Sequence, residues 1–514
     1  MDRRTGSRTK NTIRNMSFGM FGKMINLVLP FIIRTIILQK MGAEYAGLGS
    51  LFISILQVLS VAELGFSSAI IFSLYRPVAE NNRQEICQWL TLYRRIYHIV
   101  GISILGAGLV ILPFLRFLIH GSYPENINLY ILYLIYLTNT VISYFAFSYK
   151  NAILIVYQRR DILSLIEMAV NICRSAIQIM ILLTCNDYYL YIIWLPIFTL
   201  ITNLLVEYVT KKKFPELVCE KKVKKEKLDE ISDQIKGVAI GKISFVARNT
   251  FDSIILSALC GLHTVAMYSN YYLVLSSVGA LLAVVIQSMN ASIGNSIAVE
   301  EIDKNKADHD KFDFYYMWIV GWCTVCMVCM YQPFMNLWVG KELVFPFHTM
   351  VLFCVYFYIN QLSQIRSIYS EAAGLWWKFR YITMAEMAAN FFLNFIMGYF
   401  WEADGIIFAT IITAFLSSFV GITIITYKSY FKSSAGEYFY NNIVYAVVTF
   451  VVALLAMRIC GYVKRLDISG LLYHLSICAF FPNIVYLGIY MLMPRYRLFI
   501  REMIHMLYRK TVRR

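Results

Sequence analysis

Long apolar runs recur along the whole chain and are separated by short polar segments. With a window of about 20 residues, the length that a helix needs to cross a bilayer, this pattern predicts about fourteen transmembrane helices. Their centres lie near residues 28, 60, 106, 138, 174, 199, 248, 280, 324, 357, 390, 417, 450 and 482. Hydrophobic residues make up 59% of the chain and charged residues 15%, which is outside the range of soluble proteins. The sequence therefore predicts an all-α polytopic membrane protein.

Two of the predicted helices carry the same polar signature inside an apolar run. Residues 167–171 read EMAVN and residues 386–390 read EMAAN, so the motifs are 219 residues apart. The same offset places Gly42 on Gly261. We interpret it as a weak internal duplication of six helices. Because each copy has an even number of helices, both enter the membrane from the same side, and an axis along the membrane normal should relate them.

The duplication and the charge pattern together predict the domain organisation. The expected parts are an N-terminal six-helix bundle (1–210), a basic cytosolic linker (211–236), a C-terminal six-helix bundle (237–430), and two additional transmembrane helices with a basic cytosolic tail (431–514).

The formal net charge of +16 follows the predicted topology. Lys and Arg crowd the N-terminus, the loops at 83–95 and 211–236, and the tail from residue 495, whereas the intervening loops are nearly free of cations. This alternation is what the positive-inside rule predicts when both termini are cytosolic. The loop that holds Lys464 and Arg465 is the exception. No basic patch lies outside this pattern, which argues against binding of nucleic acid.

The 11 cysteines mostly lie within predicted helices and indicate no disulfide framework. Cys323, Cys326 and Cys329 are spaced three residues apart, so on a helix each side chain points in a different direction from the one before. They also lack an obvious fourth ligand, which a closed structural metal site usually has. We interpret them as packing residues and predict no metal site. The seven histidines show no spacing typical of a metal site or a catalytic base.

Charged and amide side chains inside the predicted helices are the candidate functional residues, because a charge in the hydrocarbon layer is costly unless it pairs, snorkels or faces water. In the fifth helix such residues recur every three or four positions and form one stripe: Arg160, Ser164, Glu167, Asn171, Arg174 and Gln178. The candidate substrate-binding residues are Lys23, Arg34, Arg174, Lys242, Arg248, Asn171, Asn390, Gln287 and Asn290. The candidates for coupling-ion binding or structural pairing are Glu63, Glu167, Asp252 and Glu386.

Each of these charges also has a structural interpretation. Lys23 and Lys242 lie about a turn from the cytosolic edge and can snorkel, and Arg34 can snorkel outward. Glu167 can pair with an arginine two turns away on its own helix. The deeper charges, for which we favour a water-filled passage, are Arg174, Arg248, Asp252 and Glu63. Because the cations concentrate on the first helices of each copy, that passage would suit an anionic group such as phosphate.

The chain resembles the multidrug/oligosaccharidyl-lipid/polysaccharide (MOP) exporter superfamily and, within it, the Wzx-type polysaccharide flippases. The resemblance rests on SFGMFGKMINLVLPFIIRTIILQKMGAEYAGLGSLF near the N-terminus, on VAELGF after it, and on the paired EMAVN and EMAAN. It implies two MATE-like six-helix bundles around a central cavity that opens to each side in turn. It also implies an oligosaccharide repeat unit, of the O-antigen type, on an undecaprenyl pyrophosphate carrier, which moves to the outer leaflet of the bacterial cytoplasmic (inner) membrane.

The same resemblance implies further properties. The protein would be no enzyme and would need no cofactor, with H⁺ or Na⁺ as the coupling ion at the carboxylates and with Arg and Lys holding the pyrophosphate. The expected partners are the lipid-linked oligosaccharide, membrane lipids and the polysaccharide polymerase machinery, and the expected state is a monomer.

Three other interpretations remain. A MATE-like drug exporter has this fold but usually stops at twelve helices and favours acidic cavities. A peptidoglycan-precursor flippase has cations on its second and eighth helices, where this chain offers Glu63 and no Arg or Lys. A membrane-embedded glycosyltransferase or polymerase would need a large catalytic loop, and no predicted outer loop is long enough.

Overall fold

The computed structural model describes residues 22, 25–60, 64–217, 246, 250–462 and 467–512. Within that part of the chain the regular elements are all helical. The chain divides into two compact units, Met1–Ser269 and Asn270–Arg514. The all-α fold predicted from the hydrophobic pattern is therefore confirmed.

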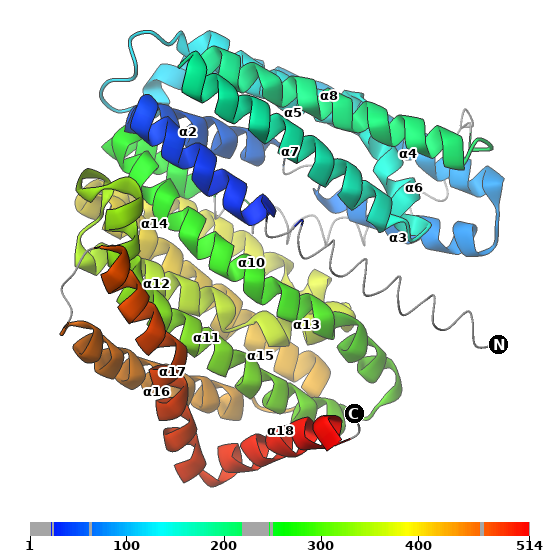
Figure 1. Cartoon of the computed structure of the whole chain (residues 1–514). Helices are drawn as coiled ribbons and strands as arrows, with labels where there is room; N and C mark the ends of the chain where they lie inside the picture. Colours follow the sequence, from blue (N-terminus) through cyan, green and yellow to red (C-terminus); the bar gives the residue numbers. More distant parts are fainter. Residues whose placement is uncertain are drawn as a thin grey trace. The chain divides into compact units, whose positions relative to one another are not determined.

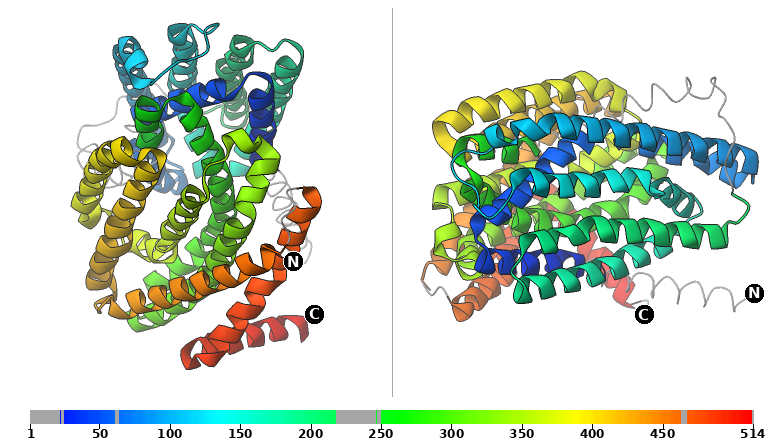
Figure 2. Two further views of the ribbon diagram at one scale, coloured as in Figure 1. Left: turned by 90° about the vertical axis from the view of Figure 1, so that its left-hand side faces the viewer. Right: turned by 90° about the horizontal axis from the view of Figure 1, so that it is seen from above.

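The first unit is a bundle of long helices, and α5, α7 and α8 run side by side in it (Figures 1 and 2). Its elements are helix 25–40, α2 (Ala43–Leu59), α3 (Leu64–Ala79), α4 (Arg83–Ile111), η2 (Leu112–Leu118), α5 (Leu129–Phe145), η3 (Ser148–Lys150), α6 (Asn151–Val156), α7 (Arg160–Thr184), α8 (Tyr188–Lys213) and the helix Thr250–Cys260. Three of these helices begin where a side-chain oxygen accepts a backbone N–H of the first turn, at Asn82, Asn128 and Asp187. Such caps satisfy donors that a helix start otherwise leaves unpaired.

The second unit contains the last helices of the chain. Its elements are α10 (Leu262–Val299, whose first residues belong to the first unit), α11 (Ile302–Val339), η4 (Lys341–Leu343), α12 (Phe347–Gln361), α13 (Gln364–Ala372), α14 (Trp376–Ala414), the π-helical turn η5 (Phe415–Gly421), α15 (Ile422–Thr426), the π-helical turn η6 (Tyr427–Phe431), α16 (Gly436–Cys460), α17 (Ile468–Leu492) and α18 (Pro494–Val512).

Eight helices among the described residues are long and apolar enough to cross a membrane, and a ninth forms if Leu129–Phe145 and Ser148–Val156, bent by 48°, make one span. The continuous segment Trp376–Phe431 is 56 residues long. A break at Trp401 and Glu402 divides it, since Glu402 has φ 50°, so this segment covers two of the predicted spans. The chain is a multi-pass membrane protein.

The break makes α14 a tight helical hairpin. A Cβ on Gly405, just after the break, would lie 2.0 Å from the carbonyl oxygen of Met397, which is before it. The two limbs therefore meet backbone to backbone, and only glycine fits at this contact.

Two glycines link the structure to the predicted duplication. Gly42 (φ 108°) precedes α2, and Gly261 (φ 84°) precedes α10. Both backbones thus adopt a conformation that favours glycine, at positions that the 219-residue offset equates. A Cβ on Gly47 would lie 2.1 Å from the carbonyl oxygen of Leu262, so the starts of α2 and α10 cross in close contact.

Aromatic packing joins the last helices to α11. The ring of Phe314 lies 5.1 Å from that of Tyr490 and stacks on Tyr496 at 5.2 Å. Trp318 Nε1 donates to Asn483 Oδ1 at 3.0 Å. Helices α17 and α18 are therefore anchored on α11 by rings as well as by aliphatic contacts. The predicted domain boundaries stay a prediction, and residues 218–236 of the predicted linker lie outside the described residues.

Candidate functional site

Arg34 lies half-buried on the first described helix and is bound by two other helices. Its guanidinium donates to Ala46 O at 2.9 Å and Ser50 Oγ at 3.3 Å on α2. It also donates to Ala266 O at 3.2 Å and to Ser269 Oγ on α10. Ser50 and Ser269 are 219 residues apart, so equivalent serines of the two copies hold the same arginine. Arg34 therefore braces the crossing of α2 and α10.

Arg174 belongs to a second network of hydrogen-bonded side chains in the first unit. It donates to Asn171 Oδ1 on α7, and Asn171 Nδ2 donates to Asn26 Oδ1 on the first described helix at 2.5 Å. Arg174 Nε is buried and has no hydrogen-bond partner within the described residues. Asn171 and Arg174 of the predicted stripe are thus hydrogen-bonded to one another, and Arg174 keeps one donor that is not satisfied among the described residues.

Tyrosines surround both arginines. Tyr191 lies within electrostatic range of Arg34 and of Arg174, and its carbonyl accepts from Gln178 Nε2 at 3.1 Å. We call Arg34, Asn171, Arg174, Gln178 and Tyr191 the cationic cluster. Its donors are of the types that bind phosphate and sugar hydroxyl groups.

The equivalent motif in the second unit lies in a different environment. Asn390 is fully buried inside the α14 hairpin, and its Nδ2 donates to Thr410 Oγ1 at 3.0 Å and Thr413 Oγ1 at 3.2 Å. Asn394 Nδ2 donates to Asn390 Oδ1 at 3.3 Å. Glu386 is 5% exposed and accepts from Ser418 Oγ at 3.5 Å. We call Glu386, Asn390, Asn394, Thr410 and Thr413 the amide network.

The two copies of the motif have therefore diverged. Glu167 is exposed on α7, whereas Glu386 is buried. No ion pair of the described residues includes Glu167, but Arg160, seven residues before it on α7, lies within electrostatic range of its carboxylate, so the predicted pairing stays a prediction. A shared sequence motif thus does not imply a shared role.

The structure places the other predicted site residues as follows. Asp252 is buried and accepts from Tyr268 OH at 2.8 Å. Gln287 and Asn290 are exposed on α10. The predicted site residues that lie outside the described residues are Lys23, Glu63, Lys242 and Arg248.

A buried charged cluster in the second unit was not predicted from the sequence. Asp313 on α11 and Arg366 on α13 are each 2% exposed and lie within electrostatic range of one another. Asp313 Oδ2 accepts from Asn442 Nδ2 at 3.4 Å. Asp313 Oδ1, Arg366 Nε and Arg366 Nη1 have no hydrogen-bond partner in the part of the chain that the structure describes. His309, fully buried one turn before Asp313, joins them. We call these four residues the α11 cluster.

The α11 cluster could not be predicted from the sequence, for a physical reason. The first turns of α11 read IDKNKADHDKFDFYY, a polar stretch that precedes the predicted apolar span and is typical of a solvated helix end. The sequence signal for the burial of Asp313 was the set of aromatic residues around it. Rings that pack together exclude water from a neighbouring carboxylate.

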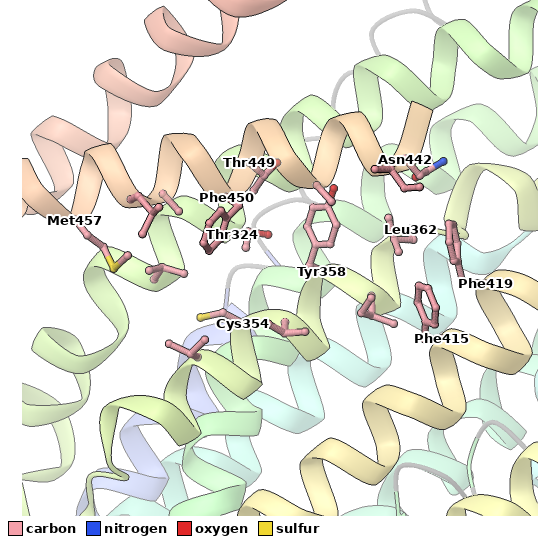
Figure 3. A pocket seen from close by; sticks show the side chains of 18 of the residues that line it. Thr324, Cys354, Tyr358, Leu362, Phe415, Phe419, Asn442, Thr449, Phe450 and Met457 are labelled. Atoms are coloured by element: carbon pink, nitrogen blue, oxygen red, sulfur yellow. The ribbon is translucent and has the colours of Figure 1, made fainter. Parts of the chain in front are cut away.

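An apolar cavity of about 730 Å³ lies in the second unit between α11, α12, η5 and α16 (Figure 3). Phe415 and Phe419 line one end of it, and Phe450 and Met457 line the other, with Tyr358 between them. Its lining is almost wholly hydrocarbon, so it suits an apolar chain rather than a sugar or an ion.

The described residues thus form two units of long apolar helices with polar clusters inside them. Comparison with solved structures identifies the fold as that of MOP superfamily transporters. One similar structure is the lipid II flippase MurJ in an inward closed conformation, which is 14% identical with a TM-score of 0.67 over 94% of this chain and 99% of that one. Another is an inward-facing multidrug resistance MATE family transporter of the MOP superfamily, 12% identical with a TM-score of 0.59 over 78% and 95%.

A third similar structure, the Vibrio cholerae MATE transporter VcmN, is 14% identical with a TM-score of 0.53 over 85% of this chain and 99% of that one. No protein-family model and no curated protein matches the sequence. The solved structures that share the fold are transporters, and at these identities the likeness shows the fold alone.

Proposed function

We propose that the protein is a flippase for lipid-linked oligosaccharides, which moves a pyrophosphate-linked repeat unit from the cytosolic to the outer leaflet of a bacterial cytoplasmic membrane. The observation that carries this proposal is the extent of the match to MurJ. It covers 94% of this chain, so the unmatched remainder is shorter than α16 and α17 together. The MATE structures described above cover 78% and 85%. The two helices after the duplication thus have at least partial counterparts in a lipid flippase.

The polar and apolar sites support the same substrate class. The cationic cluster offers guanidinium and amide donors to a pyrophosphate and to sugar hydroxyl groups. The cavity beside α16 offers an apolar surface to a prenyl chain, which needs no hydrated path. Each surface by itself suits one part of a substrate that has a charged polar head and a long apolar tail.

Arg174 tests the proposed headgroup site. In proteoliposomes that carry a fluorescent polyprenyl-pyrophosphate oligosaccharide, Arg174→Ala is expected to slow flipping about tenfold or more, since a hydrogen bond to a charged group contributes about 1.5–3 kcal/mol. Flipping is measured as the fraction of label that an impermeant quencher reaches over time. Arg160→Ala, an exposed arginine at the start of the same helix, is the matched control and should flip at the wild-type rate.

The same assay separates the candidate substrates. Wild-type protein that flips lipid II but not the oligosaccharide lipid would make it a peptidoglycan-precursor flippase. Transport of a cationic dye with neither lipid flipped would make it a drug exporter. Equal rates for Arg174→Ala and Arg160→Ala would remove Arg174 from the headgroup site.

Glu386 tests the coupling to an ion gradient. We propose that its buried carboxylate exchanges H⁺ or Na⁺ during transport, because a charge at that depth is stabilised when a cation neutralises it. Glu386→Gln is expected to flip at one rate with or without an imposed gradient, whereas the wild type should respond to one of the two ions. Glu402→Gln, exposed at the break of the same helix, serves as the control. A full gradient response in Glu386→Gln would exclude this role.

A further inference from the structure

Three cysteines from three different helices meet inside the second unit. Cys329 lies on α11, Cys460 is the last residue of α16, and Cys478 lies in the middle of α17. All three are buried, and their Sγ atoms lie within 4.8 Å of one another. They are 131 and 18 residues apart along the chain, so only the packing of the helices brings them together.

Two further ligand-type side chains adjoin this group. These are Cys326 and His474. Cys326 is one turn before Cys329 on α11, and its Sγ is 3.7 Å from the carbonyl oxygen of Cys478. His474 is one turn before Cys478 on α17 and is buried.

The orientation of His474 is informative. Its Nε2 lies 3.1 Å from the carbonyl oxygen of Cys460, and since a carbonyl only accepts, Nε2 carries the proton. Nδ1 is then the lone-pair nitrogen, and it is buried without a hydrogen-bond partner among the described residues. A histidine that donates one ring N–H to a backbone carbonyl and leaves the other nitrogen free has the tautomer of a metal ligand.

We propose that Cys329, Cys460 and Cys478 bind a zinc ion, with the fourth position filled by Cys326 or by Nδ1 of His474. Zinc in structural sites takes four sulfur or imidazole ligands in a tetrahedron, with Zn–S distances of about 2.3 Å. Sulfurs bound to one ion at that distance lie about 3.8 Å apart. Small rotations of the three side chains bring them from their present spacing to that geometry.

The position of another buried cysteine in the second unit is explained by packing alone. Cys354 on α12 is also buried, but the sulfur atom near it belongs to a methionine, Met350, at 3.6 Å. It behaves as a small apolar side chain. The Cys329 group differs because three thiols converge from three helices and a buried imidazole lies one turn before Cys478. Cys323, Cys326 and Cys329 lie along one helix, and their spacing does not show that α16 and α17 bring further thiols to it.

Such a site would connect helices from different parts of the chain. Helices α16 and α17 follow the duplicated region, and α11 belongs to it. A zinc ion held by all three would fasten the C-terminal hairpin to the second copy, in addition to the aromatic contacts of Phe314. This inference does not depend on what the protein transports.

Cobalt provides a direct test on the full-length protein in detergent. After a chelator has removed bound metal, one equivalent of Co²⁺ is expected to produce the intense sulfur-to-cobalt charge-transfer absorption of a thiolate site, and Zn²⁺ is expected to abolish it. The ligand-field bands then tell four sulfurs from three sulfurs and one nitrogen. Metal removal should also lower the thermal unfolding temperature, because metal binding to the folded state alone stabilises that state.

The double variant Cys329→Ser/Cys478→Ser should lose the charge-transfer band, while Cys354→Ser should keep it. Wild-type protein that gives no band with Co²⁺ would overturn the proposal without any variant. A Cys460–Cys478 disulfide found by mass spectrometry in protein taken directly from membranes would overturn it as well, as would an undiminished band in the double variant.

Discussion

Replacing Arg34 with alanine is expected to abolish flipping and to leave little folded protein in the membrane. The guanidinium holds α2 and α10 at their crossing, and its loss removes the hydrogen bonds that join the helix 25–40 to Ala46 and to Ala266. A hydrogen bond to a charged group contributes about 1.5–3 kcal/mol, so the loss of several such bonds at Arg34 is a large share of the stability of a typical protein. The expected result is a fall in the thermal unfolding temperature together with a loss of transport.

Arg34→Lys separates charge from geometry. Lysine keeps the positive charge but cannot reach acceptors on two helices with one planar group, so we expect an intermediate unfolding temperature. The matched control is Arg76→Ala, because Arg76 is an exposed arginine that pairs with Glu80 on the surface, at 2.9 Å, and surface ion pairs contribute little. An Arg34→Ala protein with wild-type unfolding and wild-type flipping would show that the crossing needs no arginine.

The α11 cluster gives the second large effect. Arg366→Met should destabilise the protein by about 3–5 kcal/mol, because it leaves the Asp313 carboxylate buried without a compensating charge. Asp313→Asn should destabilise it for the converse reason. The double variant should lose less than the sum of the two, with an interaction energy of about 1–3 kcal/mol, since neither charge then remains alone.

The measurement is a double-mutant cycle on unfolding in detergent at fixed pH. Lys341→Met, at a solvent-exposed turn of the same unit, controls for the loss of a cation without burial. Strictly additive losses would mean that Arg366 and Asp313 do not stabilise each other.

The hydrophobic pattern was sufficient to predict the fold, because the bilayer fixes the length and the apolar character of each helix. Of the polar residues that it places within helices, Arg34, Asn171, Arg174 and Asn390 make internal hydrogen bonds, whereas Glu167, Gln287 and Asn290 are exposed. It could not predict their partners. Arg34 is bound by Ser50 and by Ser269, more than two hundred residues away, and only the tertiary structure brings such residues together.

The spacing of polar residues along one helix was the least useful feature for predicting their burial and their partners. Glu167 and Glu386 occupy equivalent positions of the duplication, yet one is exposed and the other buried, since the copies pack against different neighbours. The thiols of Cys329, Cys460 and Cys478 converge from three helices, and Asp313 is buried by rings from α16 to α18. Each of these environments depends on contacts between helices that no single segment contains.

The α14 hairpin has a consequence for biosynthesis. Asn390 finds its acceptors on Thr410 and Thr413, in the other limb of the same hairpin, and no loop separates the limbs. A lone amide facing lipid is unfavourable, so the first limb cannot be released into the bilayer on its own at no cost. We therefore expect the two limbs to enter the membrane together, after the second limb has been synthesised.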